Sequence, residues 1–247
     1  MLIIVVCGFQ FSHEEKLDCE FKNTFYSGVG WFYHCFVSSL DNPQNNLTID
    51  GFSGGHEENK NDANVKGIWI HGTNTKYIPA SLGSLFHLTV LRMEWTQLVE
   101  IKARDFHGMQ YLEQINLNNN KLSSVPLDVF ATLTKLRIIS LSENQIEELP
   151  NGIFVNCLRL KEIYLSNNKI KYLGTEIFHE LTNLNRVHLK NNICVNKVYN
   201  GKTKVIQLKE DMRMKCKNLN EVPAMITATQ IPMNADVIEF KNQTIVK

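Results

Sequence analysis

The sequence lacks both a long apolar segment and an excess of charge of one sign. Its 247 residues contain 26 Lys and Arg against 25 Asp and Glu, which leaves a formal net charge of +1. This balance disfavours nucleic acid and anionic membranes as partners, because both attract strongly basic proteins. No apolar run reaches the roughly 20 residues that a membrane-spanning helix needs, so we expect no membrane insertion. The hydrophobic content of 43% fits a folded domain with a core.

The first apolar run, Leu2 to Phe9, has the length of the apolar part of a secretion signal. We therefore interpret residues 1–12 as a signal peptide; a first buried strand is the alternative interpretation. The sequons at Asn46 and Asn242 are predicted glycosylation sites and fit the same secretory route. Together these features predict a secreted, extracellular glycoprotein.

Cysteines are few, and four of them form two close pairs. Cys19 and Cys35 lie near the start of the chain, and Cys194 and Cys216 lie near the end. In an oxidising compartment such pairs form disulfides, so we expect one disulfide at each end of the fold.

One phrase recurs through the middle of the chain at an interval of 24 residues. The clearest copies are Leu112-x-x-Ile115-x-Leu117-x-x-Asn120-x-Leu122, Leu136-x-x-Ile139-x-Leu141-x-x-Asn144-x-Ile146 and Leu160-x-x-Ile163-x-Leu165-x-x-Asn168-x-Ile170. A partial copy runs from Leu184 to Asn192, and two weaker copies begin at Leu88 and Val65, with Thr96 and Thr73 at the Asn position. One strand in each copy gives six predicted strands.

The second half of each unit is also periodic. Phe106, Phe130, Phe154 and Phe178 recur at the same interval and are expected to stack as a spine. A single strand and its return segment cannot bury their own apolar face, so the units must stack into a solenoid. The Asn side chains that follow each strand are expected to form a buried ladder, because an amide both donates to and accepts from backbone groups at a sharp turn.

Both ends of a solenoid expose its core, and the two cysteine pairs lie where caps are needed. We assign residues 13–64 to an N-terminal cap with a polar loop, 65–192 to the repeats, and 193–216 to a C-terminal cap. Residues 217–247 have no repeat spacing and are predicted to be a poorly ordered tail.

The repeated phrase resembles the extracellular leucine-rich repeat family of 24-residue units, including secreted arthropod proteins and Toll-type ectodomains. The resemblance covers roughly residues 19–216. It implies an α/β leucine-rich repeat solenoid, with a curved parallel β-sheet on the concave face and an irregular, short-helical convex side. The segment from Cys194 to Cys216 looks like a reduced form of the family's C-terminal cap. Relatives of this kind act in recognition, adhesion, matrix or immunity, so the resemblance implies binding and leaves the partner open.

Two motifs suggest other chemistry and are interpreted as structural. Gly51-Phe52-Ser53-Gly54-Gly55 matches the nucleophile elbow of hydrolases, but its flanks resemble a polar loop and not the required strand and helix. His56, Glu57, Glu58 and Asp62 have no metal-ligand spacing, so we expect a solvated loop, no metal and no cofactor.

Cys157 is the odd cysteine. It occupies the position of Met109, Leu133 and Leu181 in sister repeats, which predicts a buried, unpaired thiol. A disulfide between two chains is the alternative.

Residues that alternate with the buried strand positions must point away from the core. On this basis the open face is predicted to carry a central row of Trp69, Arg92, Asn116, Ser140, Tyr164 and His188. Its predicted neighbours include Glu94, Trp95, Gln114, Glu143, Glu162, Arg186 and Lys190. Aromatic and Arg side chains often anchor interfaces, whereas Asn116 and Ser140 are interpreted as polar cover. The predicted ligand-binding residues are Trp69, Arg92, Trp95, Tyr164, Arg186 and His188.

The sequence therefore predicts a secreted recognition, adhesion or receptor-like protein that binds a protein or glycan partner through its concave face. A structural matrix or self-assembling module is the alternative. An enzyme is the third and least favoured class, and no catalytic residue is assigned.

Overall fold

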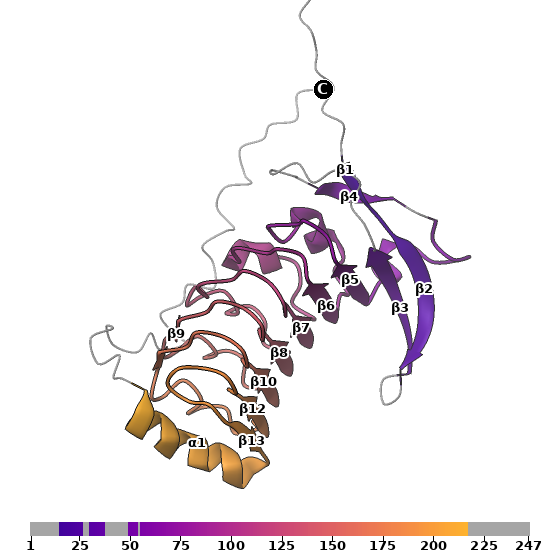
Figure 1. Ribbon diagram of the computed structural model, residues 1–247. Coiled ribbons are helices and arrows are strands. Elements are labelled where there is room, and N and C mark those ends of the chain that lie inside the picture. Colours follow the sequence, from indigo (N-terminus) through magenta and orange to yellow (C-terminus); the bar gives the residue numbers. More distant parts are fainter. Residues whose placement is uncertain (1–14, 27–29, 38–48, 54, 217–247) are drawn as a thin grey trace, which may run out of the picture.

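The computed structural model describes residues 15–26, 30–37, 49–53 and 55–216. The predicted signal peptide, the predicted tail and the sequons at Asn46 and Asn242 lie outside the described residues. The described chain winds into a solenoid whose strands lie along one side and whose return segments lie along the other (Figure 1).

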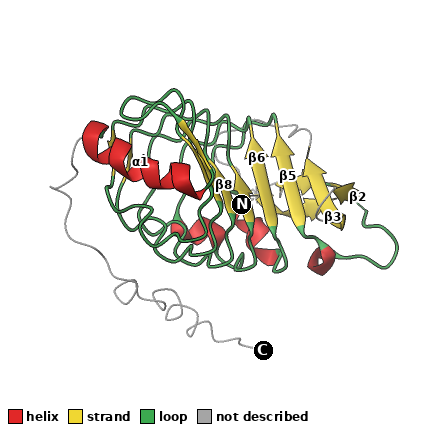
Figure 2. Ribbon diagram, turned by 90° about the horizontal axis from the view of Figure 1, so that it is seen from below, coloured by secondary structure: helices red, strands yellow, loops and turns green. Residues whose placement is uncertain are grey.

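Nine strands form one curved sheet, and Figure 2 shows β2, β3, β5 and β6 of this sheet side by side. In spatial order they are β13 (Val198–Asn200), β12 (Arg186–His188), β10 (Glu162–Tyr164), β8 (Ile138–Ser140), β7 (Gln114–Asn116), β6 (Val90–Glu94), β5 (Gly67–His71), β3 (Gly30–Val37) and β2 (Glu20–Tyr26). The six strands predicted from the repeat are β5, β6, β7, β8, β10 and β12, and each pairs in parallel with the next. The predicted α/β solenoid with a curved parallel sheet is therefore confirmed.

The core lies between the sheet and the return segments. Leu91, Ile115, Ile139 and Ile163 are neighbours in register across the sheet, and all are buried. The return segments contain the 3₁₀ helices η2 (Ala80–Ser84) and η3 (Ala103–Phe106) and the short parallel pair β9 (Glu148–Leu149) and β11 (Tyr172–Leu173).

The four phenylalanines of the return segments form the expected spine. Consecutive rings have centroid separations of 6.1, 5.9 and 6.3 Å from Phe106 through Phe130 and Phe154 to Phe178. All four are buried, so each ring covers the apolar surface that the preceding turn leaves open.

The asparagine ladder is present and links each turn to its neighbour. The Nδ2 group of Asn144 donates to the carbonyl of Leu117 in the previous turn and to those of Leu141 and Ser142 in its own turn. Its Oδ1 accepts the backbone N–H of Leu122. Asn120, Asn168 and Asn192 make equivalent bonds.

The N-terminal cap is a β-hairpin and not a loop alone. β2 and β3 pair antiparallel, β3 adds in parallel to β5, and the Cys19–Cys35 disulfide joins the hairpin as predicted. Phe21 and Tyr33 are buried against the first turn. This cap extends the sheet and closes the end of the core (Figure 1).

The polar segment that follows the hairpin is an exposed loop, as expected, but it is also bonded to the hairpin. The ring of His56 stacks on Phe21 at a centroid distance of 4.0 Å and hydrogen-bonds to the hydroxyl of Tyr33 at 3.0 Å. Its other nitrogen lies 3.0 Å from a carboxylate oxygen of Asp62, which opens the 3₁₀ helix η1 (Asp62–Asn64). Glu57 accepts the backbone N–H of Asn23. The loop is thus held on the hairpin.

The flanks of the elbow-like motif differ from the expected loop. Gly51, Phe52 and Ser53 belong to a strand, β4 (Ile49–Ser53), which pairs in parallel with β1 (Glu15–Asp18). From Gly55 the described chain continues as coil and turn, so the strand of a nucleophile elbow is present but its helix is not.

The C-terminal cap contains two elements that the repeat pattern did not predict. β13 pairs antiparallel with β12, and helix α1 (Lys202–Lys215) buries Val205, Leu208 and Met212 under the last turn. The Cys194–Cys216 disulfide, which was predicted, joins the two ends of this segment. Within the described chain no helix is long and apolar enough to cross a bilayer.

Cys157 is buried and unpaired, as its repeat position predicted. Burial raises the pKa of its thiol to about 12. Because this pKa lies above that of an unfolded cysteine, near 8.5, the neutral thiol favours the fold at neutral pH, and this contribution is lost as the pH rises toward 12.

We expect Cys157 to resist alkylation by iodoacetamide at pH 8 in the folded protein and to react fully in urea. The thiolate is the reactive form, and burial suppresses both its formation and its access. Mass spectrometry of the labelled chain measures the modification. Rapid labelling without urea would contradict the buried assignment.

Asn144→Ala should lower the free energy of unfolding by about 2 kcal/mol or more, because it leaves several buried backbone groups without a partner. Ser142→Ala is the matched control. Ser142 donates its backbone N–H to Asn118 and accepts from Asn144 through its backbone carbonyl, so removing its hydroxyl should change the free energy of unfolding by no more than about 0.5 kcal/mol. Urea unfolding followed by circular dichroism compares the two variants, and equal midpoints would refute the role of the ladder.

Candidate functional site

The open face of the sheet lies on the concave side of the solenoid, opposite the return segments (Figure 1). The predicted central row is in lateral register across six strands: Trp69, Arg92, Asn116, Ser140, Tyr164 and His188. A second row, two residues earlier in each strand, is Gly67, Val90, Gln114, Ile138, Glu162 and Arg186. The structure thus brings five of the six predicted binding residues onto two adjacent rows.

At the N-terminal end, Trp69 and Arg92 contact one another. The guanidinium of Arg92 lies over the indole of Trp69, 5.3 Å from its centroid, in cation–π geometry. The ring of His34 in the cap strand β3 lies 4.2 Å from the same indole. Trp69 was expected in open solvent but is only half exposed, because these two side chains cover it. We call His34, Trp69 and Arg92 the Trp69 cluster.

Trp95 lies just beyond β6 and is the exposed aromatic of this face, with 56% of its surface accessible. Its backbone has φ of +59°, in the left-handed region that a bulky residue rarely adopts. The equivalent position in the other turns holds Gly72, Asn119, Glu143, Asn167 and Asn191, all with positive φ. The repeat therefore imposes this conformation, and a tryptophan occupies it against its own backbone preference.

At the C-terminal end, Tyr164, Arg186 and His188 form a second group with Glu162 and Asn200, which we call the Tyr164 cluster. The Tyr164 hydroxyl donates to Glu162, and Arg186 donates to that hydroxyl at 3.1 Å and to Glu162 at 3.2 Å. The His188 ring packs edge-on to Tyr164 with centroids 4.7 Å apart. Asn200 of β13 accepts from the Nε of Arg186 at 3.1 Å and lies 3.3 Å from the Nε2 of His188.

Protonation in the Tyr164 cluster is set by its own contacts. Burial, and then the hydrogen bond to Glu162, raises the pKa of Tyr164. The hydrogen bond to Tyr164 and the charge of Glu162 raise the pKa of Arg186. The phenol therefore stays neutral and the guanidinium stays charged at physiological pH, which gives a partner a fixed pattern of donors and acceptors.

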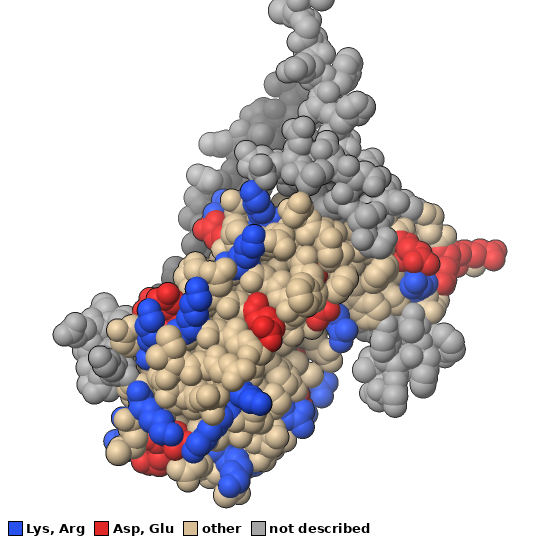
Figure 3. Space-filling view, in the orientation of Figure 1, with Lys and Arg blue, Asp and Glu red and all other residues tan. Residues whose placement is uncertain are grey.

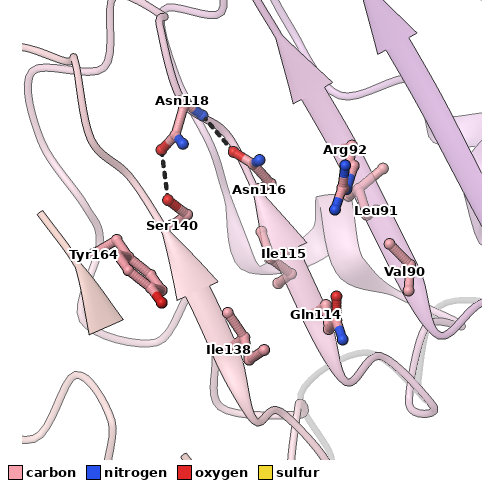
Figure 4. A pocket seen from close by; sticks show the side chains of 10 residues that line it. All are labelled: Val90, Leu91, Arg92, Gln114, Ile115, Asn116, Asn118, Ile138, Ser140 and Tyr164. Carbon is pink, nitrogen blue, oxygen red and sulfur yellow. Dashed lines mark hydrogen bonds between the residues drawn. The ribbon is translucent and has the colours of Figure 1, made fainter. Parts of the chain in front are cut away.

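A hollow of about 250 Å³ lies between the two clusters. Figure 4 shows Arg92 on one side of it and Tyr164 on the other, with Asn116, Ser140 and Ile138 between them. Ser140 was expected as exposed polar cover but is buried, since its hydroxyl donates to Asn118 at 2.7 Å. Asn116 and Asn118 lie toward one end of the hollow, and Val90, Gln114 and Ile138 lie in register toward the other (Figure 4).

Sequence reasoning missed five contributors to this face: Val90, Asn118, Ile138, His34 and Asn200. Val90 and Ile138 occupy outward positions of their strands, and the same alternation that selected Gln114 could have found them. His34 and Asn200 come from the caps, outside the repeat, so no repeat position pointed to them.

The face presents several kinds of group that a partner molecule could contact. It offers cation–π contacts, hydrogen bonds and a partly apolar hollow. In the described part of the chain, no three His, Cys, Asp or Glu side chains converge as metal ligands. Over the view in Figure 3, Lys and Arg side chains are interspersed with Asp and Glu.

Comparisons with known proteins agree with this architecture. Residues 87–202 match, in six copies, the family model described as a BspA type leucine rich repeat region. Just under half of the chain thus matches a leucine-rich repeat family, and the described residues have the leucine-rich repeat fold. A search of curated proteins finds no match to it.

Solved structures that share the fold include two complexes and one leucine-rich repeat domain. The structure of the LRIM1/APL1C complex aligns with a TM-score of 0.56 at 20% identity, covering 72% of this chain and 32% of that one. The APL1 leucine-rich repeat domain aligns with a TM-score of 0.54 at 22% identity, covering 65% and 41%. The Drosophila Toll–Spatzle complex aligns with a TM-score of 0.50 at 19% identity, covering 59% and 19%. The chain thus spans less than half the length of each.

Trp95→Asn should raise the free energy of unfolding by about 1 kcal/mol, because asparagine tolerates the left-handed conformation better than tryptophan does. The reverse exchange, Asn119→Trp at the equivalent position, should lower it by a similar amount. Thermal or urea unfolding of the three proteins measures both changes. A less stable Trp95→Asn variant would show that the indole contributes more to packing than its backbone conformation costs.

Proposed function

We propose that this chain is a secreted recognition protein that binds a protein partner through its concave face. The observation that carries the proposal is the arrangement of that face. The Trp69 cluster and the Tyr164 cluster flank one hollow, and the exposed Trp95 is bonded through its backbone N–H to Asn118, which lines that hollow. Trp, Tyr and Arg are the residue types that dominate binding energy at protein interfaces.

The conformation of Trp95 supports a role in binding. A large exposed aromatic brings little folding advantage, and this one also stands in a left-handed backbone position. Strain of this kind persists where function requires the side chain. Trp95 is thus the residue of this face that folding alone explains least.

Size and similarity also support a protein partner. Nine strands at about 4.8 Å spacing give a sheet nearly 40 Å wide, which can supply the roughly 800 Å² per side of a stable complex. Leucine-rich repeat scaffolds serve protein recognition, and the aligned structures include the LRIM1/APL1C and Toll–Spatzle complexes. The two disulfides favour an oxidising compartment, which supports secretion.

The double variant Trp95→Ala/Tyr164→Ala should bind the partner at least ~100-fold more weakly, since two anchors at about 1.4 kcal/mol or more each are removed. The partner is first captured from extracellular fluid by cross-linking to the tagged wild-type chain and then purified. Affinity is measured by surface plasmon resonance.

Phe86→Ala is the matched control, because Phe86 is as exposed as Trp95, at 57%, but lies in a return segment. It should leave the affinity unchanged. Unchanged affinity in the folded double variant would refute the assignment to the concave face. If the captured partner is a second copy of the chain, the self-assembling alternative is supported instead.

A further inference from the structure

Away from the concave face, a continuous row of residues lies along the side of the sheet where the parallel strands begin, just before the strands. Backbone N–H to carbonyl bonds of 2.7–2.8 Å link each member to the preceding turn. The row reads Lys66, Thr89, Glu113, Arg137, Lys161 and Asn185, each directly before a strand, and it ends at Gly201, which directly follows β13. Its members are thus lateral neighbours, about 4.8 Å apart.

A second row lies two residues earlier in each turn and combines aromatic with basic side chains. His87 and Tyr111 have ring centroids 5.9 Å apart, and the ammonium group of Lys135 lies 3.8 Å from the centre of the Tyr111 ring. Arg159 follows in the next turn and is exposed. The two rows together place Lys135, Arg137, Arg159 and Lys161 on two adjacent turns; we call these four residues the basic edge.

The basic edge is only partly neutralised. Glu113 pairs with Arg137 at 3.0 Å. Among the described residues, Arg159 and Lys161 take part in no ion pair within 4.0 Å. On the opposite edge, where the strands end, two lysines have side-chain partners. Lys171 pairs with Glu147 at 2.9 Å, and Lys169 lies 3.5 Å from the side-chain oxygen of Gln145. In a chain with a net charge of only +1, the basic edge is a local concentration of positive charge.

We propose that the basic edge binds an acidic polysaccharide that carries sulfate or carboxylate groups. A regular row of cations one or two side chains wide fits a linear polyanion lying across successive turns, and guanidinium groups match planar anions through paired hydrogen bonds. The exposed ring of Tyr111 adds an apolar surface for a sugar ring. Disulfides persist in oxidising compartments such as the extracellular space, where acidic polysaccharides are abundant.

This site is separate from the proposed protein-binding face, so an experiment can refute one of the two proposals without refuting the other. The concave clusters use the outward positions of the strands, whereas the basic edge uses residues that precede the strands. A polysaccharide held at the edge would leave the hollow open to a protein.

The test is the binding of the full chain to heparin, measured by isothermal titration at several salt concentrations. Arg159→Ala/Lys161→Ala should weaken binding about tenfold or more near 0.1 M salt, and the slope of log K against log salt should fall by about two, one for each cation removed. Arg159→Lys/Lys161→Arg should retain wild-type binding, because the charge is kept.

Lys121→Ala/Lys169→Ala is the matched control, since it removes the same charge from exposed positions on the opposite edge. It should change heparin affinity less than twofold, with the circular dichroism spectrum confirming that each variant is folded. Equal losses in the two double variants would overturn the proposal, as would binding of a single-stranded DNA oligonucleotide as tight as that of heparin. Either result would indicate nonspecific electrostatic attraction between surface cations and any polyanion.

Discussion

The asparagine ladder is the interaction on which the rest of the structure depends. Each repeat turns sharply after a short strand, and the turn leaves backbone N–H and carbonyl groups inside the fold. An amide both donates and accepts, so one side chain per turn satisfies groups of its own turn and of the turn before. Threonine at the earlier positions offers a single hydroxyl, and Thr96 relies on Asn120 of the following turn as its acceptor. The pitch of the solenoid follows from this bonding.

Stacking of this kind leaves the two ends of the core exposed, and the caps solve the problem in different ways. The N-terminal cap continues the sheet with a hairpin whose loop is fixed by the stacking of His56 on Phe21. The C-terminal cap adds the antiparallel strand β13 and covers the last turn with the apolar side of α1. Tyr199 of β13 donates to Asp211 of α1 at 2.6 Å, which joins the strand to the helix. A disulfide closes each cap.

Parallel pairing gives the concave face its chemistry. Residues at equivalent repeat positions become neighbours, so a side chain contacts others that are 22 to 24 residues away, as Arg186 contacts Glu162 and Tyr164. The repeat conserves the buried positions and leaves the outward ones free to vary. Such a face can carry a distinct set of side chains on every strand while the scaffold beneath stays the same. The caps take part too, because His34 and Asn200 each complete a cluster.

The sequence alone determined the solenoid, its six repeat strands, the phenylalanine spine, the ladder and both disulfides. These features depend on residue type at a fixed interval, and such a period translates directly into contacts between neighbouring turns. Six binding residues were predicted from the sequence, and the grouping of five of them into two clusters is visible only in three dimensions. Whether they bind a partner remains the proposal above.

Tertiary structure decided what lies outside the period. The hairpin, β4, β13 and α1 have no repeated counterpart, so no interval in the sequence indicates which elements they contact. The burial of Ser140 and the partial cover of Trp69 depend on side chains of adjacent strands, Asn118 in one case and His34 with Arg92 in the other. Alternation along one strand indicates the side to which a residue points. Only the neighbouring strands determine how much water still reaches it.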